Sequence, residues 1–249
     1  MANLILPDPR MEMPELLEPG RKPVGPVEVD RSHPLARGLT EVVLFHGLRD
    51  TLTNERYQLL ASGAIDAQNF IGDGGDSVFY MGTNPSHTGQ ISIAAGVITT
   101  ATDLQHIVSA DSQSNSRRDY QFRLSNQKLQ FIPFVGGSTG VADGATTVPQ
   151  NKHFIAGCTF DKNAATNNAR VFLDGSLDGQ TTKAGALDAD LSGVSIGNRV
   201  TNVNYTTENI DGFGLSGLIT FVFIWGDRAL TAAEHLEIAR NPYQFLIPA

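Results

Sequence analysis

Hydrolysis of a glycosidic bond requires a pair of carboxyl groups in the active site. In retaining enzymes the two carboxyl groups lie about 5–5.5 Å apart. A strand can supply this spacing as Glu-x-Asp-x-x-Glu, since alternate residues of a strand face the same side. The chain contains no such run, and Glu208-Asn-Ile-Asp211 has a different spacing within a polar segment. Glycoside hydrolysis is therefore disfavoured, and we expect no catalytic residues.

Nucleophilic, phosphate-binding and metal-binding chemistry is not expected either. Cys158, the single cysteine, falls on an apolar strand face where an inert thiol is expected, and we expect no serine nucleophile elbow. The glycine-rich run 136–140 lacks the Lys-Ser/Thr of a phosphate-binding loop. Asp73-Gly-Gly-Asp76 offers two oxygen ligands for Ca²⁺, but such a cluster is more often a turn. The six histidines show no paired ligand spacing, so we expect neither a metal nor a cofactor.

Composition argues against two further classes of partner. The formal net charge is −8 and the basic residues are scattered, whereas nucleic-acid binding needs clustered Lys and Arg. Apolar runs fall far short of the roughly 18 residues that span a bilayer. The N-terminus lacks the basic region of a secretory leader, and a single cysteine rules out an internal disulfide. We expect a chain made in a reducing cytoplasm that binds neither nucleic acid nor membrane.

Residues 1–38 differ in composition from the rest of the chain. Seven of the 12 prolines fall here; because proline fixes φ and removes a backbone donor, a long helix or a central strand is excluded. A disordered tail is one interpretation. The favoured one is an extended arm along a neighbouring surface, because the segment is more apolar than a solvated linker requires. Its apolar residues include Leu4, Leu6, Leu16 and Leu17.

The remainder, residues 39–249, predicts short strands at spacings near ten residues, separated by turn residues. Examples are Gln90–Ile98, Tyr120–Leu124, Lys128–Ile132 and Lys152–Phe160. Ala169–Leu173 precedes Asp174-Gly175, a favoured tight-turn dipeptide. The Gly/Thr/Ala-rich segment 136–149 is interpreted as a long surface loop. Amphipathic helices between strands are missing, so we predict an all-β chain folded as an antiparallel sandwich.

The stretch 215–242 carries the clearest structural signal: an apolar strand, a tight turn and one short helix. Thr231 and Glu234 have the Ser/Thr-x-x-Glu spacing of a capping box, which marks the start of the helix. Asn241-Pro242 ends it, because the residue before a proline avoids helical geometry. We predict a C-terminal helix over about 231–241.

The order of motifs from residue 150 to 242 resembles that of laminin-G-like domains with a concanavalin A-like jelly roll. The matching segments are Asp174-Gly175, Ser195-Ile-Gly-Asn198, Gly217-Leu-Ile, Ile224-Trp225, Arg228-Ala-Leu230 and Thr231-x-x-Glu234. Over residues 40–150 only the strand pattern agrees. The opening 33–39 and the ending 241–245 are similar to those of laminin-G-like proteins encoded among bacteriophage structural genes. The resemblance implies a jelly roll preceded by an arm.

The second resemblance also implies a role. It indicates a non-enzymatic virion protein of a tailed bacteriophage, made in the host cytoplasm and placed on the capsid exterior as a decoration or cementing subunit. Its implied partners are the major capsid protein or other virion proteins, and further copies of itself in a homo-oligomer. The alternative is a glycan-binding adhesion module of a tail or fibre. Tyr205, Phe213 and Tyr120 are the candidate glycan contacts in that case.

One departure from the family pattern concerns association. Family members commonly carry charged residues where this chain has Thr220, Phe221 and Phe223. Alternate strand residues face opposite sides, so Phe221, Phe223 and Trp225 face one way, and Val222 and Ile224 the other. Burying one phenylalanine contributes about 1.5–3 kcal/mol. We therefore predict that the arm, the helix or a second subunit covers this face. The arm residues predicted to pack there are Leu4, Leu6, Leu16 and Leu17.

Overall fold

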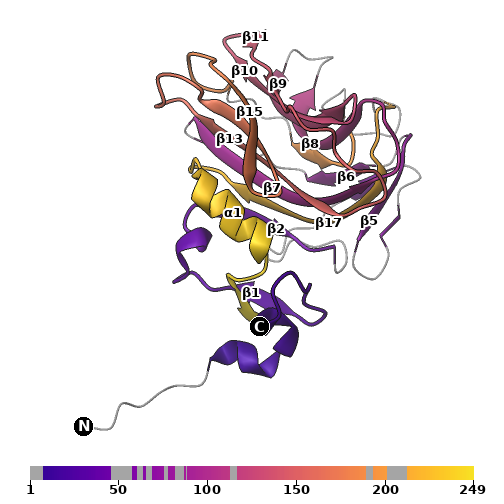
Figure 1. Cartoon of the computed structure of the whole chain (residues 1–249), viewed down its shortest axis with the longest axis vertical. Coiled ribbons are helices and arrows are strands. Elements are labelled where there is room, and N and C mark those ends of the chain that lie inside the picture. The colour runs from indigo at the N-terminus through magenta and orange to yellow at the C-terminus, as the bar shows by residue number, and fades with distance from the viewer. Residues whose placement is uncertain are drawn as a thin grey trace.

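The computed structural model consists of two β-sheets stacked face to face, with a smaller lobe at one side that holds the arm and the end of the chain (Figure 1). It describes residues 8–45, 58–60, 64–65, 69–75, 78–81, 87, 89–112, 117–188, 193–200 and 212–249. Within these ranges, no helix is long and apolar enough to cross a membrane. The all-β antiparallel sandwich with one short C-terminal helix is confirmed.

The first sheet, called sheet I below, is the one that faces the arm. Its order is β15-β14-β13-β7-β17-β5-β4. Along one edge of β17, β5 pairs with residues 216–219 and β2 pairs with residues 222–225. The strands are β2 (Leu39–Val43), β4 (Ala64–Ile65), β5 (Phe70–Asp73), β7 (Gln90–Thr99), β13 (Phe154–Asp161), β14 (Ala169–Leu173), β15 (Ser176–Thr181) and β17 (Ser216–Trp225). All these pairings are antiparallel.

The second sheet, called sheet II, covers the other side of the core. Its order is β11-β10-β9-β8-β16-β6-β3, with β12 also paired to β10. The strands are β3 (Gln58–Leu60), β6 (Val78–Met81), β8 (Gln105–Ser112), β9 (Arg117–Ser125), β10 (Lys128–Val135), β11 (Ser138–Thr139), β12 (Ala142–Asp143) and β16 (Val194–Ile196). The interpretation of 136–149 as a plain loop was wrong, because β11 and β12 both extend the edge of β10.

The main core lies between the two sheets and is built from one face of each strand. Along β17, Val222 and Ile224 belong to this core, whereas Phe221, Phe223 and Trp225 belong to a separate cluster on the outer face of sheet I. Period-two alternation therefore places apolar side chains on both faces of β17. The outer face must be covered by something other than sheet II.

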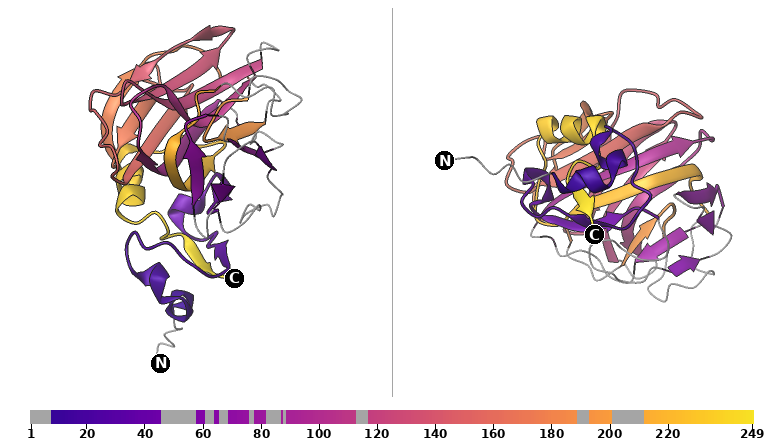
Figure 2. Two further views of the ribbon diagram at one scale, coloured as in Figure 1. Left: turned by 90° about the vertical axis from the view of Figure 1, so that its right-hand side faces the viewer. Right: turned by 90° about the horizontal axis from the view of Figure 1, so that it is seen from below.

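The arm is folded rather than simply extended. Over its described residues, 8–38, it forms three short 3-10 helices, η1 (Pro9–Glu12), η2 (Pro14–Leu17) and η3 (Pro34–Ala36), and the strand β1 (Val27–Val29). Each helix has a proline in its first turn, where the fixed φ is favourable and the missing N–H is not needed. β1 pairs with β18 (Leu246–Pro248) at the end of the chain. Figure 2 shows this small sheet beneath sheet I.

The helix α1 (Ala232–Arg240) packs on the outer face of sheet I (Figure 1). Its capping box is complete: Thr231 Oγ1 accepts from Glu234 N at 3.3 Å, and Glu234 Oε2 accepts from Thr231 N at 2.8 Å. The Asp174-Gly175 turn touches the helix, since a Cβ on Gly175 would lie 2.5 Å from Leu236 Cα. The turn needs positive φ at both residues, 49° and 77°, which is the geometry of a type I′ hairpin turn.

Candidate functional site

The cluster on the outer face of sheet I joins the arm to the jelly roll. Phe221, Phe223 and Trp225 are fully buried in it. Phe221 and Phe223 stack with ring centroids 4.5 Å apart, and Phe245 packs edge-on to Phe223 at 5.0 Å. The residues packed around them from the arm and the end of the chain include Leu16, Val27, Leu35, Ala36, Tyr243, Phe245 and Leu246. The chain itself therefore covers both phenylalanines.

The arm leucines named from the sequence have different environments. Leu16 is 1% exposed within the cluster, whereas Leu17 is 48% exposed. Leu4 and Leu6 lie outside the described residues. Contact between this face and a second subunit stays a prediction.

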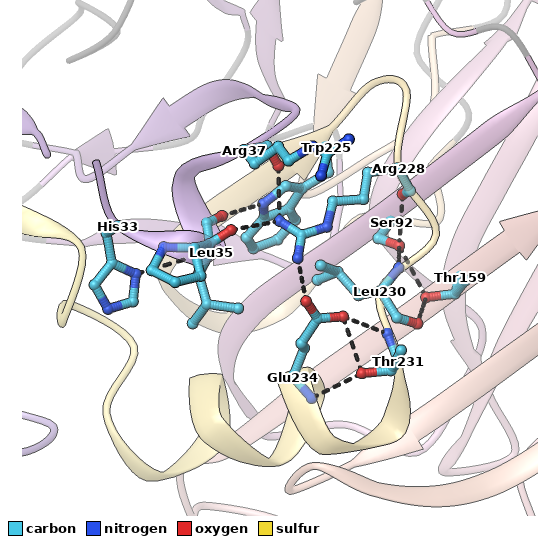
Figure 3. Close-up of polar contacts among 11 residues, drawn as sticks. His33, Leu35, Arg37, Ser92, Thr159, Trp225, Arg228, Leu230, Thr231 and Glu234 are labelled. Atoms are coloured by element: carbon cyan, nitrogen blue, oxygen red, sulfur yellow. Dashed lines mark hydrogen bonds and ion pairs between the residues drawn. The ribbon is translucent and has the colours of Figure 1, made fainter. Parts of the chain in front are cut away.

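Hydrogen bonds at the start of α1 fix the arm in place (Figure 3). Trp225 Nε1 donates to Leu35 O at 2.7 Å. Arg228 Nη1 donates to Pro34 O and Arg37 O, both at 2.8 Å, and its Nη2 pairs with Glu234. The η3 turn is thereby tied to the capped helix, so the arm has one defined position on sheet I.

A buried Ser–Thr–His relay lies beneath α1. Ser92 Oγ is 2.9 Å from Thr159 Oγ1, which is 2.8 Å from His235 Nε2. Ser92 also bonds the main chain of Arg228 and Leu230. All three side chains are buried, and no carboxylate takes part in these bonds, so their role is to anchor the helix on the sheet.

A pocket of about 390 Å³ opens beside this cluster, where the arm and the end of the chain meet sheet I. Six separate segments contribute to it. The lining residues are Gly20, Lys22, Asn69, His153, Ile155, Asp174, Thr220, Phe221, Ala239, Pro242 and Tyr243. The sheet supplies an apolar wall through Ile155 and Phe221, both buried, while most of the polar groups come from loops and from the arm.

Thr220 is the centre of the polar contacts in the pocket. Its carbonyl oxygen accepts from Lys22 Nζ at 2.6 Å, which holds the arm lysine against the sheet. Its Oγ1 lies 3.3 Å from His153 Nε2. The Tyr243 hydroxyl also hydrogen-bonds the Thr220 side chain. One strand residue thus orients groups from three distant parts of the chain.

Gly96 on β7 makes room for this arrangement. A Cβ at this position would lie 2.2 Å from Thr220 Oγ1, 2.7 Å from Phe221 Cε1 and 2.8 Å from His153 Nε2. These separations are below any normal contact, so three side chains of the pocket occupy space that another residue at this position would take. The wall of the pocket therefore depends on a glycine here.

Asp174 brings a carboxylate to the pocket from the β14–β15 turn. Its Oδ1 accepts from Ile155 N at 2.8 Å, and Ile155 O accepts from Asp174 N at 2.8 Å. The paired bonds fix both the turn and the side chain. The carboxyl group is consequently held in a defined orientation before any ligand arrives.

Two residues of the pocket lining, Lys22 and Asp174, carry a formal charge. Desolvation by the surrounding protein lowers the pKa of His153, although its side chain is partly exposed, and the nearby Asp174 only partly opposes this, so the neutral imidazole is favoured at pH 7. Burial also raises the pKa of Tyr243, against the effect of its hydrogen bond to Thr220. Lys22 and Asp174 carry opposite formal charges, so the lining is neutral overall.

Sheet II carries a second group of polar side chains on its outer face, and these are already paired. Asp143 Oδ1 accepts from Gln130 at 2.5 Å, and Gln130 Oε1 accepts from Arg123 at 3.0 Å. Arg123 also donates to Gln121, which bonds Asp111. Asp111 Oδ2 further accepts from Arg199 at 3.2 Å. Asp111 and Gln121 are each 3% exposed, so this network braces the strands and leaves its central groups inaccessible to a ligand.

The serine and cysteine side chains that could act as nucleophiles lie in strands. Ser138 and Ser195 stand in Gly-x-Ser-x-Gly spacing, which the sequence reasoning overlooked. Neither forms the strand-to-helix elbow that such a nucleophile needs, since Ser138 lies in β11 and Ser195 is buried in β16. Cys158 is buried, and burial raises the pKa of its thiol. Within the described ranges no three His, Cys, Asp or Glu side chains could hold a metal, and Asp76 lies outside them.

Two of the aromatic glycan contacts named from the sequence lie in the part of the chain that the structure describes, and their environments differ. Tyr120 was a wrong candidate, because it is fully buried in the main core. Phe213 is 43% exposed, and Tyr205 lies outside the described residues. The pocket was missed because its residues are isolated in sequence. Asp174, Phe221 and Pro242 were singled out in the sequence, but as a turn, a strand face and a helix end rather than as parts of one pocket.

Several solved structures share this fold. Domain 4 of AbnA, a GH43 extracellular arabinanase from Geobacillus stearothermophilus, in complex with arabinotriose, is 15% identical with a TM-score of 0.59, and the match covers 81% of this chain and 98% of that one. The CBM40 of the Ruminococcus gnavus IT-sialidase, bound to α2,3 sialyllactose, is 13% identical with a TM-score of 0.50, and covers 61% and 84%. The receptor-binding domain of botulinum neurotoxin type G is 13% identical with a TM-score of 0.58; the match covers 81% of this chain but only 50% of that domain.

Sequence comparison assigns the family. None of the curated proteins matches the chain. A laminin-G-type family model of the concanavalin A-like lectin/glucanases superfamily matches residues 73–234, which include most strands of both sheets. With the jelly-roll topology described above, the chain belongs to the concanavalin A-like lectin/glucanases superfamily.

Proposed function

We propose that this chain is a non-enzymatic glycan-binding module, and that the pocket between the arm, sheet I and the end of the chain is its binding site. The observation that carries the proposal is the lining of that pocket. It combines fixed polar groups with an apolar wall in about 390 Å³, within the range of about 300–1,000 Å³ that small-molecule sites occupy.

The polar groups suit a sugar because hydroxyls both donate and accept hydrogen bonds. Asp174 offers a carboxylate acceptor, Lys22 an ammonium donor, and His153 a neutral imidazole. Ile155, with Ala239 and Pro242, offers apolar surface for the C–H face of the ring. A pocket with a few convergent polar groups on an apolar wall is the usual form of such a site.

The groups are also held in place before binding. Lys22 is bonded to Thr220 O, and Asp174 to Ile155 N. Side chains that are already ordered lose less rotamer entropy when a ligand binds. This favours measurable affinity from a small contact area.

The number of carboxylates in the pocket supports binding without hydrolysis. Glycoside hydrolysis uses two carboxyl groups flanking the scissile bond. Asp174 is the single acidic residue in the pocket lining. The arabinanase domain with arabinotriose and the sialidase CBM40 with sialyllactose support the choice of ligand class, since both carry a carbohydrate on this fold.

The proposal can be tested with a glycan array and calorimetry on the full chain. We expect specific retention of some glycans and about a tenfold loss of affinity in Lys22→Met, the magnitude of one charged hydrogen bond. Lys162→Met is the matched control, because Lys162 is exposed and is not among the pocket residues. Absence of any glycan binding, or an equal effect of the two substitutions, would contradict the proposal.

A second candidate function is the virion role implied by the resemblance to bacteriophage proteins. Met11, Leu17 and Val24 of the arm are large hydrophobic residues with exposed side chains, and such residues can contact a neighbouring subunit or a capsid protein. A pull-down with the major capsid protein tests this role. Full incorporation into particles by a Met11→Ser, Leu17→Ser, Val24→Ser triple variant would argue against contact through the arm.

A further inference from the structure

We infer that the pocket takes the terminal residue of a glycan, and that this residue is an uncharged sugar. The inference rests on the proposed glycan binding at this site, and it specifies which glycans bind and by which part. Two separate features of the structure carry it: the way the pocket is enclosed, and the balance of charge in its lining.

The cover beside the pocket favours binding of the end of a glycan chain. A volume of about 390 Å³ lies at the small end of ligand pockets, which leaves room for one or two sugar rings. Across the sheet from the pocket, Phe223, Trp225 and Ala94 are fully covered by the arm and the end of the chain. A glycan lying along this part of the sheet would collide with that cover. Further sugar residues therefore cannot extend over this part of the sheet, and this favours recognition of a chain end.

Charge in the lining favours a neutral ring. Asp174 is fixed by its bond to Ile155 N, so it cannot move away from an incoming carboxylate without breaking that bond. Lys22 is the one cation of the lining, and its ammonium group already donates to Thr220 O at 2.6 Å. His153 adds no positive charge at pH 7. A sugar carboxylate could accept from the same Lys22 ammonium, but it would also meet the fixed like charge of Asp174.

Neutral hydroxyls meet no such conflict. A sugar hydroxyl can donate to the Asp174 carboxylate and accept from the Lys22 ammonium, and both bonds are strengthened because one partner is charged. The same pair that opposes an anionic sugar therefore supports an uncharged one. Asp174 is the residue that determines this preference.

The charge part is tested by comparing matched ligands on the full chain. Methyl galactoside and methyl glucoside are titrated against galacturonate and glucuronate by calorimetry. We expect about tenfold tighter binding of the neutral member of the preferred pair, equivalent to about 1.4 kcal/mol. In Asp174→Asn the preference should shrink by most of that factor, because asparagine keeps the bond from Ile155 N and tolerates the positive φ of the turn. Asp103→Asn, at an exposed position outside the pocket, is the control and should change nothing.

The end-recognition part is tested with oligosaccharides of increasing length built from the preferred sugar. We expect the dissociation constant per molecule to change less than about threefold beyond the disaccharide, because additional residues make no contact. Affinity that rises with each added residue up to a hexasaccharide would overturn end recognition. Uronates that bind as tightly as the neutral sugars, or tighter, would overturn the charge assignment.

These results are distinguishable from failure of the proposed function. If glycans bind and Lys22→Met weakens them, glycan binding at the pocket stands whichever sugars are preferred. In that case, tighter binding of uronates would refute only the preference for a neutral sugar, and affinity that grows with oligosaccharide length would refute only end recognition. If no sugar of either charge binds, the proposed function and the further inference are both refuted.

Discussion

His235 provides a sharp test of how α1 is held on sheet I. The side chain is 2% exposed, its Nε2 lies 2.8 Å from Thr159 Oγ1, and its ring stacks on Phe172 with centroids 3.9 Å apart. A Cβ on Gly157 would lie 2.7 Å from His235 Nδ1, so the ring sits directly on the strand. Burial lowers the pKa of His235 to about 3, from 6.5 for the free side chain.

The lower pKa of His235 in the folded chain makes stability fall as the pH falls. Above pH 6.5 the imidazole is neutral whether the chain is folded or unfolded. Below pH 6.5 the unfolded chain binds a proton that the folded chain refuses until about pH 3, so stability is lost as the pH falls across this window. One pKa unit corresponds to about 1.36 kcal/mol, so the whole window amounts to about 5 kcal/mol. At pH 5 the loss relative to pH 8 is about 2 kcal/mol.

Urea and thermal denaturation at pH 8 and pH 5 measure this loss in the native chain and in His235→Gln. Glutamine keeps a polar group near Thr159 but does not titrate. The variant should be less stable at pH 8, yet lose about 2 kcal/mol less than the native chain on going to pH 5. For a chain of this size that difference corresponds to about 4–8 °C in Tm. The other titrating groups are common to both proteins and cancel in the comparison.

Equal losses in the two proteins would contradict a neutral, buried imidazole at His235. That result would mean that His235 is protonated in the folded state at pH 5, and hence that the ring is accessible to water or paired with an acid. A larger loss in the variant would refute it as well.

Three further substitutions test the contacts that build the pocket and hold the arm. Gly96→Ala should cost about 1–3 kcal/mol by overpacking and weaken glycan binding, because its Cβ would collide with Thr220; native stability in urea together with native affinity would contradict this. Trp225→Phe leaves Leu35 O without its donor and should cost about 1–3 kcal/mol in urea titration; a change below measurement error would show that the bond does not anchor the arm. Thr231→Ala removes the helix cap and should cost about 0.5–2 kcal/mol, measured by calorimetry, with Thr231→Ser as the control that keeps the cap and most of the stability.

The closing strand and helix could be predicted because local rules act on neighbouring residues. Alternation along 221–225 assigned the two faces of β17, and the Thr231–Glu234 spacing located the helix start within one residue. Asp174-Gly175 likewise specified its own turn through the positive φ that both residues accept. In each case the partners that determine the structure lie within a few positions of each other.

Other features depend on partners far apart in the chain. The pairing of β1 with β18 joins residues about 220 positions apart, and nothing local in a proline-rich segment marks that strand. The pocket assembles Lys22, His153, Asp174, Thr220 and Tyr243 only after the arm has packed on sheet I. Tyr120 was misjudged because an aromatic residue next to a polar one is equally compatible with a core position and an exposed one. Its burial is decided by the strand register in sheet II.

The proposed function depends on a sugar binding in the pocket beside Thr220. An amide chemical-shift titration of the full chain with methyl galactoside, methyl glucoside and methyl arabinoside measures this binding residue by residue. We expect saturable shifts for His153, Thr220 and Tyr243, with smaller amplitudes at equal ligand concentration in Thr220→Val. No shift with any of the three sugars, or shifts confined to sheet II, would contradict binding in this pocket.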